Sequence, residues 1–300
     1  MQLPSVRGKL IENADLSALT WFRVGGPAEV IFQPADEDDL AIFLSELDAD
    51  IPVIAIGVGS NLLVRDGGVR GVVIRLGGAF AKIEIGGTSV SAGAAALDAS
   101  VAKAAAREGI AGLEFYRGVP GTIGGALAMN AGAYDGETKD ILIEAHAIDR
   151  NGQRHVFKNH EMNFSYRHSD PGDGLIFTRA VFKGTQGDPA DITARMEDIM
   201  ARREASQPIR ERTGGSTFEN PDPENSGGRK SWQLIDAVGG RGRIVGDAQV
   251  SQQHCNFMIN RGNATATDLE TLIESLRNDV REQCDVDLRW EIRRIGEGLP

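Results

Sequence analysis

Three polar segments of the chain carry side chains that could take part in chemistry. Arg167 lies in the aromatic-containing segment NFSYRHS, where a guanidinium could clamp a carboxylate. Ser216 follows a Gly-Gly turn in RTGGSTFENP, and Glu291 lies between two arginines near the end of the chain. Each has a plainer alternative: a surface arginine, a turn or cap serine, and a carboxylate in a solvent-facing row of ion pairs. None of the three by itself defines a mechanism.

A glycine-rich segment at residues 118–133, GVPGTIGGALAMNAGA, carries no charged residue. Its glycines at Gly118, Gly121, Gly124 and Gly125 permit φ > 0 and close approach of the backbone to a ligand. The ALAMN that follows could open a short helix whose N–H groups bind phosphate. Close packing of backbone on backbone is the alternative use of these glycines.

A second glycine-rich loop, GVGSN at residues 57–61, directly follows the apolar run IPVIAI, which is typical of a buried strand. It is not a dinucleotide fingerprint, because the third glycine is missing and two short β-like runs follow where a helix is required. No Walker-type phosphate loop occurs either. Two uncharged glycine loops of this kind predict one long phosphate-bearing ligand, held by backbone N–H groups from two places.

The elements that must position these loops are predicted from apolar periodicity and local capping signals. Asp36 starts a predicted helix with a single apolar face. A second helix is predicted over residues 94–107, with Gly109 at its C-terminus, and it leads directly to the 118–133 segment. Asn151-Gly152 predicts a hairpin between two strands.

The remainder of the chain predicts two longer helices and a closing strand. Asp188-Pro189 caps the first of these helices. A capping box from Thr267 to Glu270 opens the second, which carries an apolar face. A final strand alternates inward apolar and outward charged residues over positions 286–293.

The composition indicates a folded protein with room for two or three domains, because 41% of its 300 residues are apolar. The net charge of −11 argues against nucleic acid and an anionic membrane as partners, so an anionic ligand would need local arginines. Cys255 and Cys284 form no C-x-x-C motif, which argues against a disulfide framework or a metal site. The N-terminus has no apolar signal region and no run approaches about 18 apolar residues, so we expect a soluble cytoplasmic protein.

Taken together, seven motifs resemble the UDP-N-acetylenolpyruvoylglucosamine reductase family, flavoenzymes that complete UDP-N-acetylmuramate for bacterial peptidoglycan. They occur in the order of the family across nearly the whole chain, at residues 20–28, 57–76, 118–134, 165–169, 214–221, 250–260 and 288–296. This collinearity is far more specific than any single motif.

The resemblance implies an α+β fold of the vanillyl-alcohol-oxidase type. Two subdomains, residues 1–80 and 81–190, would hold FAD non-covalently, and a C-terminal α+β domain at residues 191–300 would bind a nucleotide-sugar. NADPH is the implied co-substrate, and a monomer or weak homo-oligomer is expected. The residues implied for FAD binding are Val24, Gly25, Gly57, Val58, Gly59, Ser60, Asn61, Gly118, Pro120, Gly121, Thr122, Gly124, Gly125, Asn130 and Ala133.

By the same motif matching, Arg167, Ser216 and Glu291 are similar to the catalytic residues of the family. In the implied ping-pong reaction NADPH reduces the flavin and leaves, and the reduced flavin passes a hydride to the enolpyruvyl group. Arg167 would stabilise the resulting negative charge, Ser216 would protonate the α-carbon, and Glu291 would position Arg167 or a water.

The resemblance also implies substrate contacts. Asn220 would lie close to the nucleotide-sugar, and the spacing between the first two catalytic candidates is similar to the shorter branch of the family, which lacks a tyrosine-bearing loop over the substrate. Members commonly carry lysine where this chain has Glu219, so we expect the diphosphate contact at Arg212 or Lys230. Two other functions stay open: an alcohol-oxidising FAD enzyme of the same fold, and a non-catalytic nucleotide-sugar binder.

Overall fold

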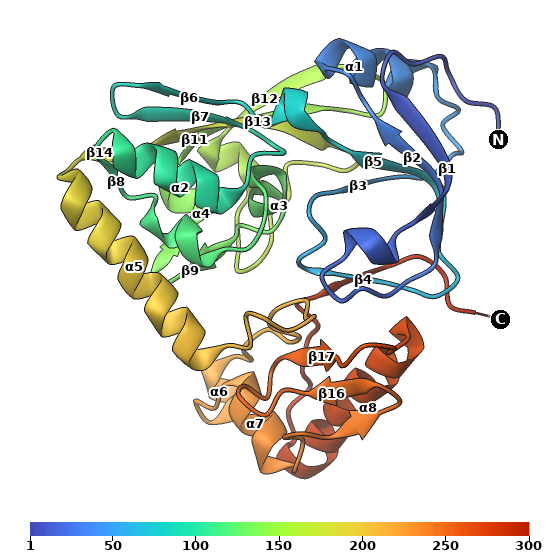
Figure 1. Cartoon of the computed structure of the whole chain (residues 1–300), viewed down its shortest axis with the longest axis vertical. Coiled ribbons are helices and arrows are strands. Elements are labelled where there is room, and N and C mark those ends of the chain that lie inside the picture. The colour runs from blue at the N-terminus through green and yellow to red at the C-terminus, as the bar shows by residue number, and fades with distance from the viewer. Residues whose placement is uncertain (300) are drawn as a thin grey trace. The chain divides into compact units, whose positions relative to one another are not determined.

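A computed structural model describes residues 1–299 and divides them into two compact units (Figure 1). Unit 1 comprises residues 1–12, 30–57 and 71–202. Unit 2 comprises residues 13–29 and 58–70 together with the described chain from residue 203 onward. Helices and mainly antiparallel strands mix in both units, as an α+β fold requires. The predicted division into three domains at residues 80 and 190 stays a prediction.

Unit 1 contains a five-stranded antiparallel sheet in the order β12-β11-β13-β7-β6. Its strands are β6 (Ile83–Gly86), β7 (Ser89–Gly93), β11 (Leu142–Ile148), β12 (Arg154–Lys158) and β13 (Ile176–Lys183). The predicted hairpin joins β11 to β12: Asp149 Oδ1 accepts hydrogen bonds from the N–H groups of Asn151 and Gln153, and Gly152 takes a φ of 74°. The sequence prediction at this turn is confirmed.

Helices α2 (Asp98–Arg107) and α3 (Ile123–Ala128) pack on strands of this sheet and bury an apolar core (Figure 1). The prediction that the α2 helix begins at residue 94 is wrong. Residues 94–97 are instead paired with the segment 121–124 through main-chain hydrogen bonds, and this tertiary pairing overrides their alanine-rich helix propensity.

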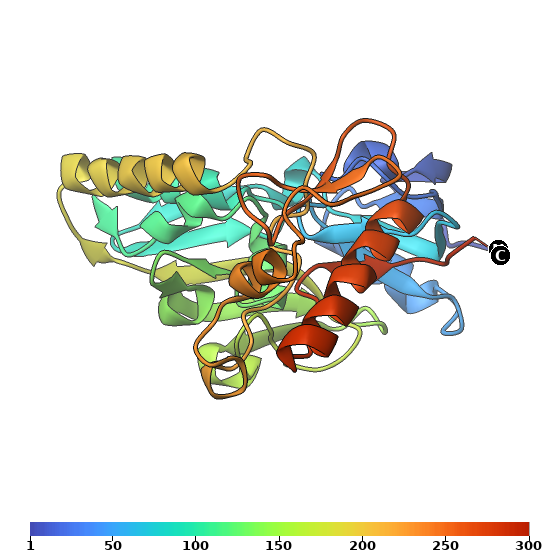
Figure 2. The ribbon, with the colours of Figure 1, turned by 90° about the horizontal axis from the view of Figure 1, so that it is seen from below.

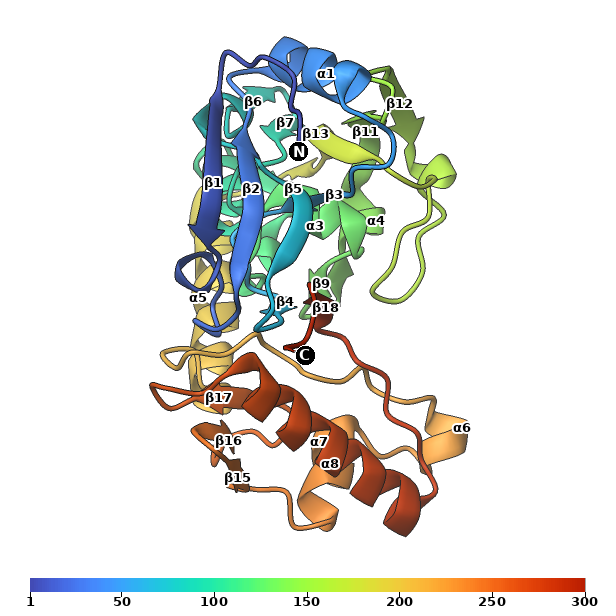
Figure 3. The same ribbon diagram turned by 90° about the vertical axis from the view of Figure 1, so that its right-hand side faces the viewer.

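A four-stranded sheet in the order β1-β2-β5-β3 is seen face-on in Figure 3. Its strands are β1 (Lys9–Asp15), β2 (Pro27–Gln33), β3 (Val53–Ile56) and β5 (Val69–Arg75). Strands β3 and β5 are parallel, with Val53 opposite Val72. Helix α1 (Glu37–Glu46) starts as predicted at Asp36, whose carboxylate accepts a hydrogen bond from the N–H of Asp39 at 2.9 Å.

Unit 2 is organised around the long helix α8 (Ala266–Cys284), drawn in red in Figure 2. Its buried positions, from Leu269 to Val280, recur at helical spacing and form a core with α7 (Ser231–Ala237). The N-cap is Thr265, so the prediction of a capping box from Thr267 to Glu270 is wrong by two residues. The capping box runs instead from Thr265 to Asp268, and the carboxylate of Asp66 accepts further hydrogen bonds from the N–H groups of Ala266 and Thr267 at 2.9 and 2.8 Å.

The chain after α8 alternates as predicted, with Val286, Leu288 and Ile292 buried, but only β18 (Arg293–Ile295) forms a strand ladder, parallel to β4 (Leu62–Val64). Helix α5 (Pro189–Ser206) is long and begins at the predicted Asp188-Pro189. The short elements are β8 (Ile110–Ala111), β9 (Gly132–Ala133), β10 (Gly136–Glu137), β14 (Thr185–Gln186), β15 (Ile244–Val245), β16 (Ala248–Val250), β17 (Met258–Asn260), α4 (Thr138–Ile141), α6 (Pro223–Ser226), and the 3₁₀ turns η1 (Ser17–Leu19), η2 (Gly78–Phe80), η3 (Glu114–Gly118) and η4 (Asn159–Met162). Among residues 1–299, no helix combines the length and the apolar character that crossing a bilayer requires.

Candidate functional site

The 118–125 loop of unit 1 is braced by the extended segment 94–97. The N–H groups of Ile123 and Gly124 donate to main-chain carbonyls of that segment at 3.0 and 2.8 Å. Two of the N–H groups predicted to bind phosphate therefore form main-chain hydrogen bonds within the protein. Cofactor binding by the rest of the loop stays a prediction.

The glycines of this loop separate into two kinds when a Cβ is added to each. At Gly118 the Cβ would lie 2.8 Å from the ring of Tyr134, and at Gly124 it would lie 3.2 Å from Ala94, so these two serve packing. At Gly125 it would meet no atom closer than 3.9 Å, and the residue is exposed without a positive φ. Glycine is about 1 kcal/mol less favourable than alanine in a helix. The fold gives no reason for Gly125, whereas close approach of a ligand such as FAD does.

The two glycine loops meet within unit 1. A Cβ on Gly57 would lie 2.6 Å from Thr122 Oγ1, so the end of one loop lies directly against the other. The two loops are therefore close enough for one ligand to contact both, and that contact stays a prediction. Gly25 and Gly59, in unit 2, have φ of 113° and 66° and no room for a Cβ, so their backbone conformation demands glycine. Of the other residues predicted to bind FAD, Pro120 and Gly121 lie in unit 1 and Val24, Val58, Ser60 and Asn61 in unit 2.

Asn130, which follows α3, links residues 137–139 to the segment that carries Arg167. Its Nδ2 donates to Ser165 O at 3.0 Å and to Glu137 Oε2 at 3.1 Å, while its Oδ1 accepts from the N–H of Lys139 at 3.0 Å. The side chain is fully buried. It therefore holds the local backbone together. The predicted flavin contact of Asn130 and of Ala133, in β9, is not tested by this geometry.

Arg167 lies at a sharp turn of unit 1. Ser165 and His168 pair across the turn, and Arg167 takes a φ of 54°, a left-handed conformation that non-glycine residues adopt rarely. Its guanidinium lies 5.2 Å from the centre of the Tyr166 ring, within range of a cation–π contact. Such strained backbone concentrates at functional sites, which favours a functional role over a plain surface arginine.

Ser216 and Glu291 are brought together in unit 2 by main-chain hydrogen bonds. Ser216 pairs with Phe257 in an isolated bridge. The residue after Ser216, Thr217, accepts a hydrogen bond of 2.9 Å at its carbonyl from the N–H of Glu291. Asn61 Nδ2 donates to the carbonyl of Glu291 at 3.1 Å. The last residue of the 57–61 loop is thus bonded to the segment carrying Glu291, a role of the Asn61 side chain that its motif did not indicate.

The predicted substrate residues lie in two places of unit 2. Asn220 Oδ1 accepts from the N–H of Ser231 at 3.3 Å, and the Ser231 hydroxyl donates to the carbonyl of Glu219, so Lys230 is held next to both. Arg212 instead donates through Nη1 to Gly262 O at 3.1 Å. Lys230 is therefore the better candidate for the cation that replaces the expected lysine at Glu219.

Asp98 is a buried acid beneath the 118–125 loop that sequence reasoning missed. Its side chain is fully buried, and within residues 1–299 neither carboxyl oxygen makes a hydrogen bond of good geometry. A Cβ on Gly121 would lie 2.7 Å from its Oδ2. Burial raises the pKa of Asp98 well above its usual range, and the nearby N–H of Gly121 opposes that shift only in part. The pKa of the Tyr116 phenol is also raised, mainly by its own burial and in smaller part by the nearby Asp98.

This raised pKa predicts a pH-dependent effect of Asp98→Asn on the stability of the apoprotein. In the unfolded chain the carboxyl ionises near pH 4, whereas the folded protein keeps it protonated, so stability is lost as pH rises from there toward the folded pKa. Asparagine mimics the neutral acid at every pH. We expect the variant to melt at least about 3 °C higher at pH 8, the shift that about 1 kcal/mol gives in a protein of this size. Calorimetry at pH 4 is the control, where the advantage should vanish. Equal changes in Tm at both pH values would contradict the neutral state of Asp98.

Other features of the structure do not compete as sites. A groove of about 560 Å³ in unit 1 is lined by residues that include Arg154 and Lys82, but these cations are paired with Asp38 and Glu84 and none of the predicted residues lines it. Among residues 1–299 no cluster of His, Cys, Asp and Glu has the arrangement of a metal site.

Comparison with known proteins matches two parts of the chain to described families. Residues 28–158 match the family described as FAD binding domain, and residues 207–295 match UDP-N-acetylenolpyruvoylglucosamine reductase, C-terminal domain. The chain is 62% identical, over 98% of its own length and 94% of the relative, to UDP-N-acetylenolpyruvoylglucosamine reductase of Parvibaculum lavamentivorans.

Solved structures agree with this match. The crystal structure of UDP-N-acetylenolpyruvylglucosamine reductase from Thermus caldophilus is 34% identical, with a TM-score of 0.83 over 97% of this chain and 100% of that one. The 6-hydroxy-D-nicotine oxidase of Arthrobacter nicotinovorans, at 15% identity and a TM-score of 0.50 over 92% of this chain and 60% of that one, shows likeness of fold alone. The predicted α+β FAD-binding fold and the family resemblance are confirmed.

Proposed function

The chain belongs to the UDP-N-acetylenolpyruvoylglucosamine reductase family, and we propose that Arg167, Ser216 and Glu291 are its catalytic residues. It is an NADPH-dependent FAD oxidoreductase that reduces UDP-N-acetylglucosamine enolpyruvate to UDP-N-acetylmuramate in peptidoglycan synthesis. The observation that supports the residue assignment best is the hydrogen bonding of Glu291 to Thr217 and to Asn61, which joins the segments of two predicted catalytic residues to a glycine loop.

The three side chains divide the work of adding two hydrogens across the enolpyruvyl double bond. FAD, when bound, accepts hydride from NADPH and supplies it to the substrate. Arg167 stabilises the negative charge that then spreads over the α-carbon and the carboxylate. Ser216 donates the proton that the α-carbon takes up, and Glu291 positions Arg167 or a water for the reaction. Exposed Gly125 leaves the backbone bare where the cofactor diphosphate would approach.

Anaerobic half-reactions of the purified protein test this function. The protein is expected to be yellow, to release FAD on acid precipitation, and to bleach with NADPH. Addition of the enolpyruvyl substrate should then restore the oxidised spectrum in one turnover. Bleaching by a simple alcohol without NADPH would indicate an alcohol-oxidising enzyme, and protein that stays colourless after incubation with FAD would indicate a nucleotide-sugar binder.

Lys230 is expected to carry the substrate diphosphate contact. Its alanine variant should raise the KM for the nucleotide-sugar about fivefold with little change in kcat, the effect of losing roughly 1 kcal/mol from an exposed charge contact. Arg212→Ala is the matched control, because its guanidinium already bonds Gly262. Steady-state kinetics decide it. A larger rise in KM for Arg212→Ala, or no rise in either variant, would show that Lys230 does not contact the substrate diphosphate.

The proposal includes a cytoplasmic location and a monomer or weak homo-oligomer. The acidic net charge of −11 supports a protein that does not use nucleic acid or anionic membranes as partners. Sedimentation at micromolar concentration tests the assembly state, and a stable large oligomer would contradict it.

A further inference from the structure

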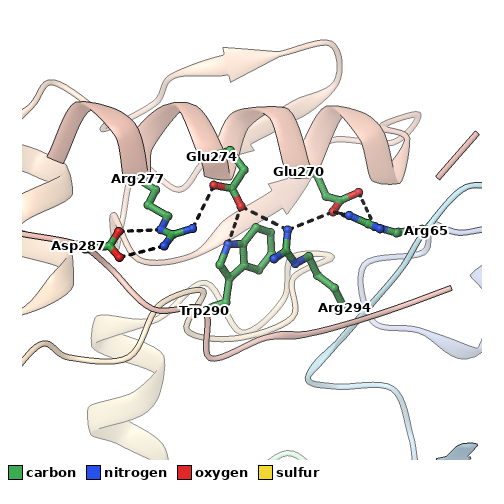
Figure 4. A network of polar contacts seen from close by, with 7 residues as sticks. All are labelled: Arg65, Glu270, Glu274, Arg277, Asp287, Trp290 and Arg294. Carbon is green, nitrogen blue, oxygen red and sulfur yellow. Dashed lines mark hydrogen bonds and ion pairs between the residues drawn. The ribbon is translucent and has the colours of Figure 1, made fainter. Parts of the chain in front are cut away.

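Trp290, the residue before Glu291, is held by Glu274 of helix α8 and by Arg294 of β18. Its indole Nε1 donates to Glu274 Oε1 at 2.9 Å, and the guanidinium of Arg294 lies 4.2 Å from the centre of its ring. Arg294 Nη1 in turn lies 3.3 Å from Glu274 Oε1 and 3.4 Å from Glu270 Oε1. We call Glu270, Glu274, Trp290 and Arg294 the Trp290 clamp (Figure 4).

The clamp is charge-balanced at both ends. Arg65 donates to Glu270 through Nε and Nη2 at 2.9 to 3.1 Å. Arg277 lies 3.6 Å from Glu274 and makes two hydrogen bonds of 3.0 Å to Asp287. Figure 4 shows these residues as one continuous row along α8. Because the Glu270 side chain is only 18% exposed and the pairs form a network, the row orders its neighbours better than isolated surface pairs do.

The clamp fixes the register of the segment that carries Glu291. Trp290 pairs with Phe218 in an isolated antiparallel bridge. Their rings are arranged edge to face, with the ring centres 6.2 Å apart. The next residue, Glu291, donates its N–H to Thr217 O. Successive side chains of an extended chain point to opposite sides. Anchoring Trp290 on α8 therefore directs Glu291 away from that helix.

We propose that Glu274 is a positioning residue for Glu291, acting through the indole of Trp290. The proposal rests on the catalytic role of Glu291 proposed above. Glu274 takes no part in the transfer of hydride or proton. Its loss would free the indole and leave Arg294 and Arg277 with one anionic partner fewer, so the segment carrying Glu291 would shift relative to Ser216.

The test is a double-mutant cycle read by half-reaction. Glu274→Ala is expected to slow reoxidation by the substrate about tenfold, since small displacements of catalytic groups cost about that much or more, while reduction by NADPH stays near its normal rate. Glu274→Gln keeps an acceptor for the indole and should recover most of the rate. Trp290→Phe keeps the ring but removes the donor and should match Glu274→Ala. The double variant should be no slower than either single one.

Asp279→Asn is the matched control, because it breaks a different ion pair of α8, with Arg243. It should lower Tm without changing either half-reaction. Multiplied slowing in the double variant, equal slowing of both half-reactions, or normal reoxidation in Glu274→Ala would each overturn the proposal. If Glu274→Ala does not fold, Trp290→Phe carries the test by itself: reoxidation should slow about tenfold with normal reduction by NADPH, and normal reoxidation would overturn the proposal.

Glu291→Gln, measured in the same series, separates this inference from the function beneath it. Normal reoxidation in that variant would overturn the role of Glu291 and the proposal with it. Slow reoxidation in Glu291→Gln beside normal reoxidation in the Glu274 variants would reject only the clamp.

Discussion

Ser216→Ala is expected to leave the reduction of the flavin by NADPH near its normal rate and to slow reoxidation by the enolpyruvyl substrate at least about 10²-fold, the lower end expected for loss of a general acid. The reduction step creates no carbanion on the substrate, so it needs no proton from this hydroxyl. The main chain at Ser216 is held by its bridge to Phe257 and by the hydrogen bond that the Thr217 N–H donates to the carbonyl of Asn256. Alanine therefore removes the hydroxyl without a reason for the backbone to move.

Ser216→Cys is the companion variant, since a thiol can still donate a proton and is the stronger acid. It should retain more reoxidation activity than the alanine variant. Stopped-flow absorbance of the flavin measures both half-reactions separately. Equal slowing of the two would identify Ser216 as a structural turn residue, and normal reoxidation in Ser216→Ala would remove it from the mechanism.

Gly125→Leu is expected to abolish retention of FAD, and Gly125→Ala to weaken FAD binding about tenfold, by placing a side chain where the backbone should meet the cofactor. The same alanine should stabilise the apoprotein by about 1 kcal/mol, because alanine is the better helix former and its Cβ meets open space. Opposite signs for affinity and stability distinguish a ligand-facing glycine from a packing glycine. Titration of FAD into the apoprotein and calorimetry of the apoprotein measure the two.

Gly124 provides the contrasting position in the same loop. A Cβ there would lie 3.2 Å from Ala94, so Gly124→Leu should lower the stability of the apoprotein. If that variant loses FAD, the loss follows from the disturbed packing and is no evidence that Gly124 contacts the cofactor. Gly86→Leu, at another open glycine of unit 1, is the control for a bulky side chain outside the loops. FAD affinity unchanged in Gly125→Leu would leave the loop without a ligand-binding role.

The amino-acid sequence alone determined the features that depend on neighbouring residues. Asp36 caps α1, Asp188-Pro189 opens α5, and Asn151-Gly152 turns the β11–β12 hairpin, because each signal acts on backbone groups within four residues of itself. The glycine loops predict a phosphate-bearing ligand, and the order of the seven motifs identifies the family. Residue type and short spacing were sufficient for these.

Only the tertiary structure decided features in which distant segments compete for the same backbone groups. Residues 94–97 are extended because carbonyls among them accept hydrogen bonds from the 118–125 loop, and the first N–H groups of α8 donate to Asp66, a residue of a distant segment. Asp98 is buried by the same loop, which no local pattern indicated. The bonding of Asn61 to the carbonyl of Glu291 joins residues far apart in sequence. Such contacts depend on which partner satisfies a buried polar group, and only the folded chain selects that partner.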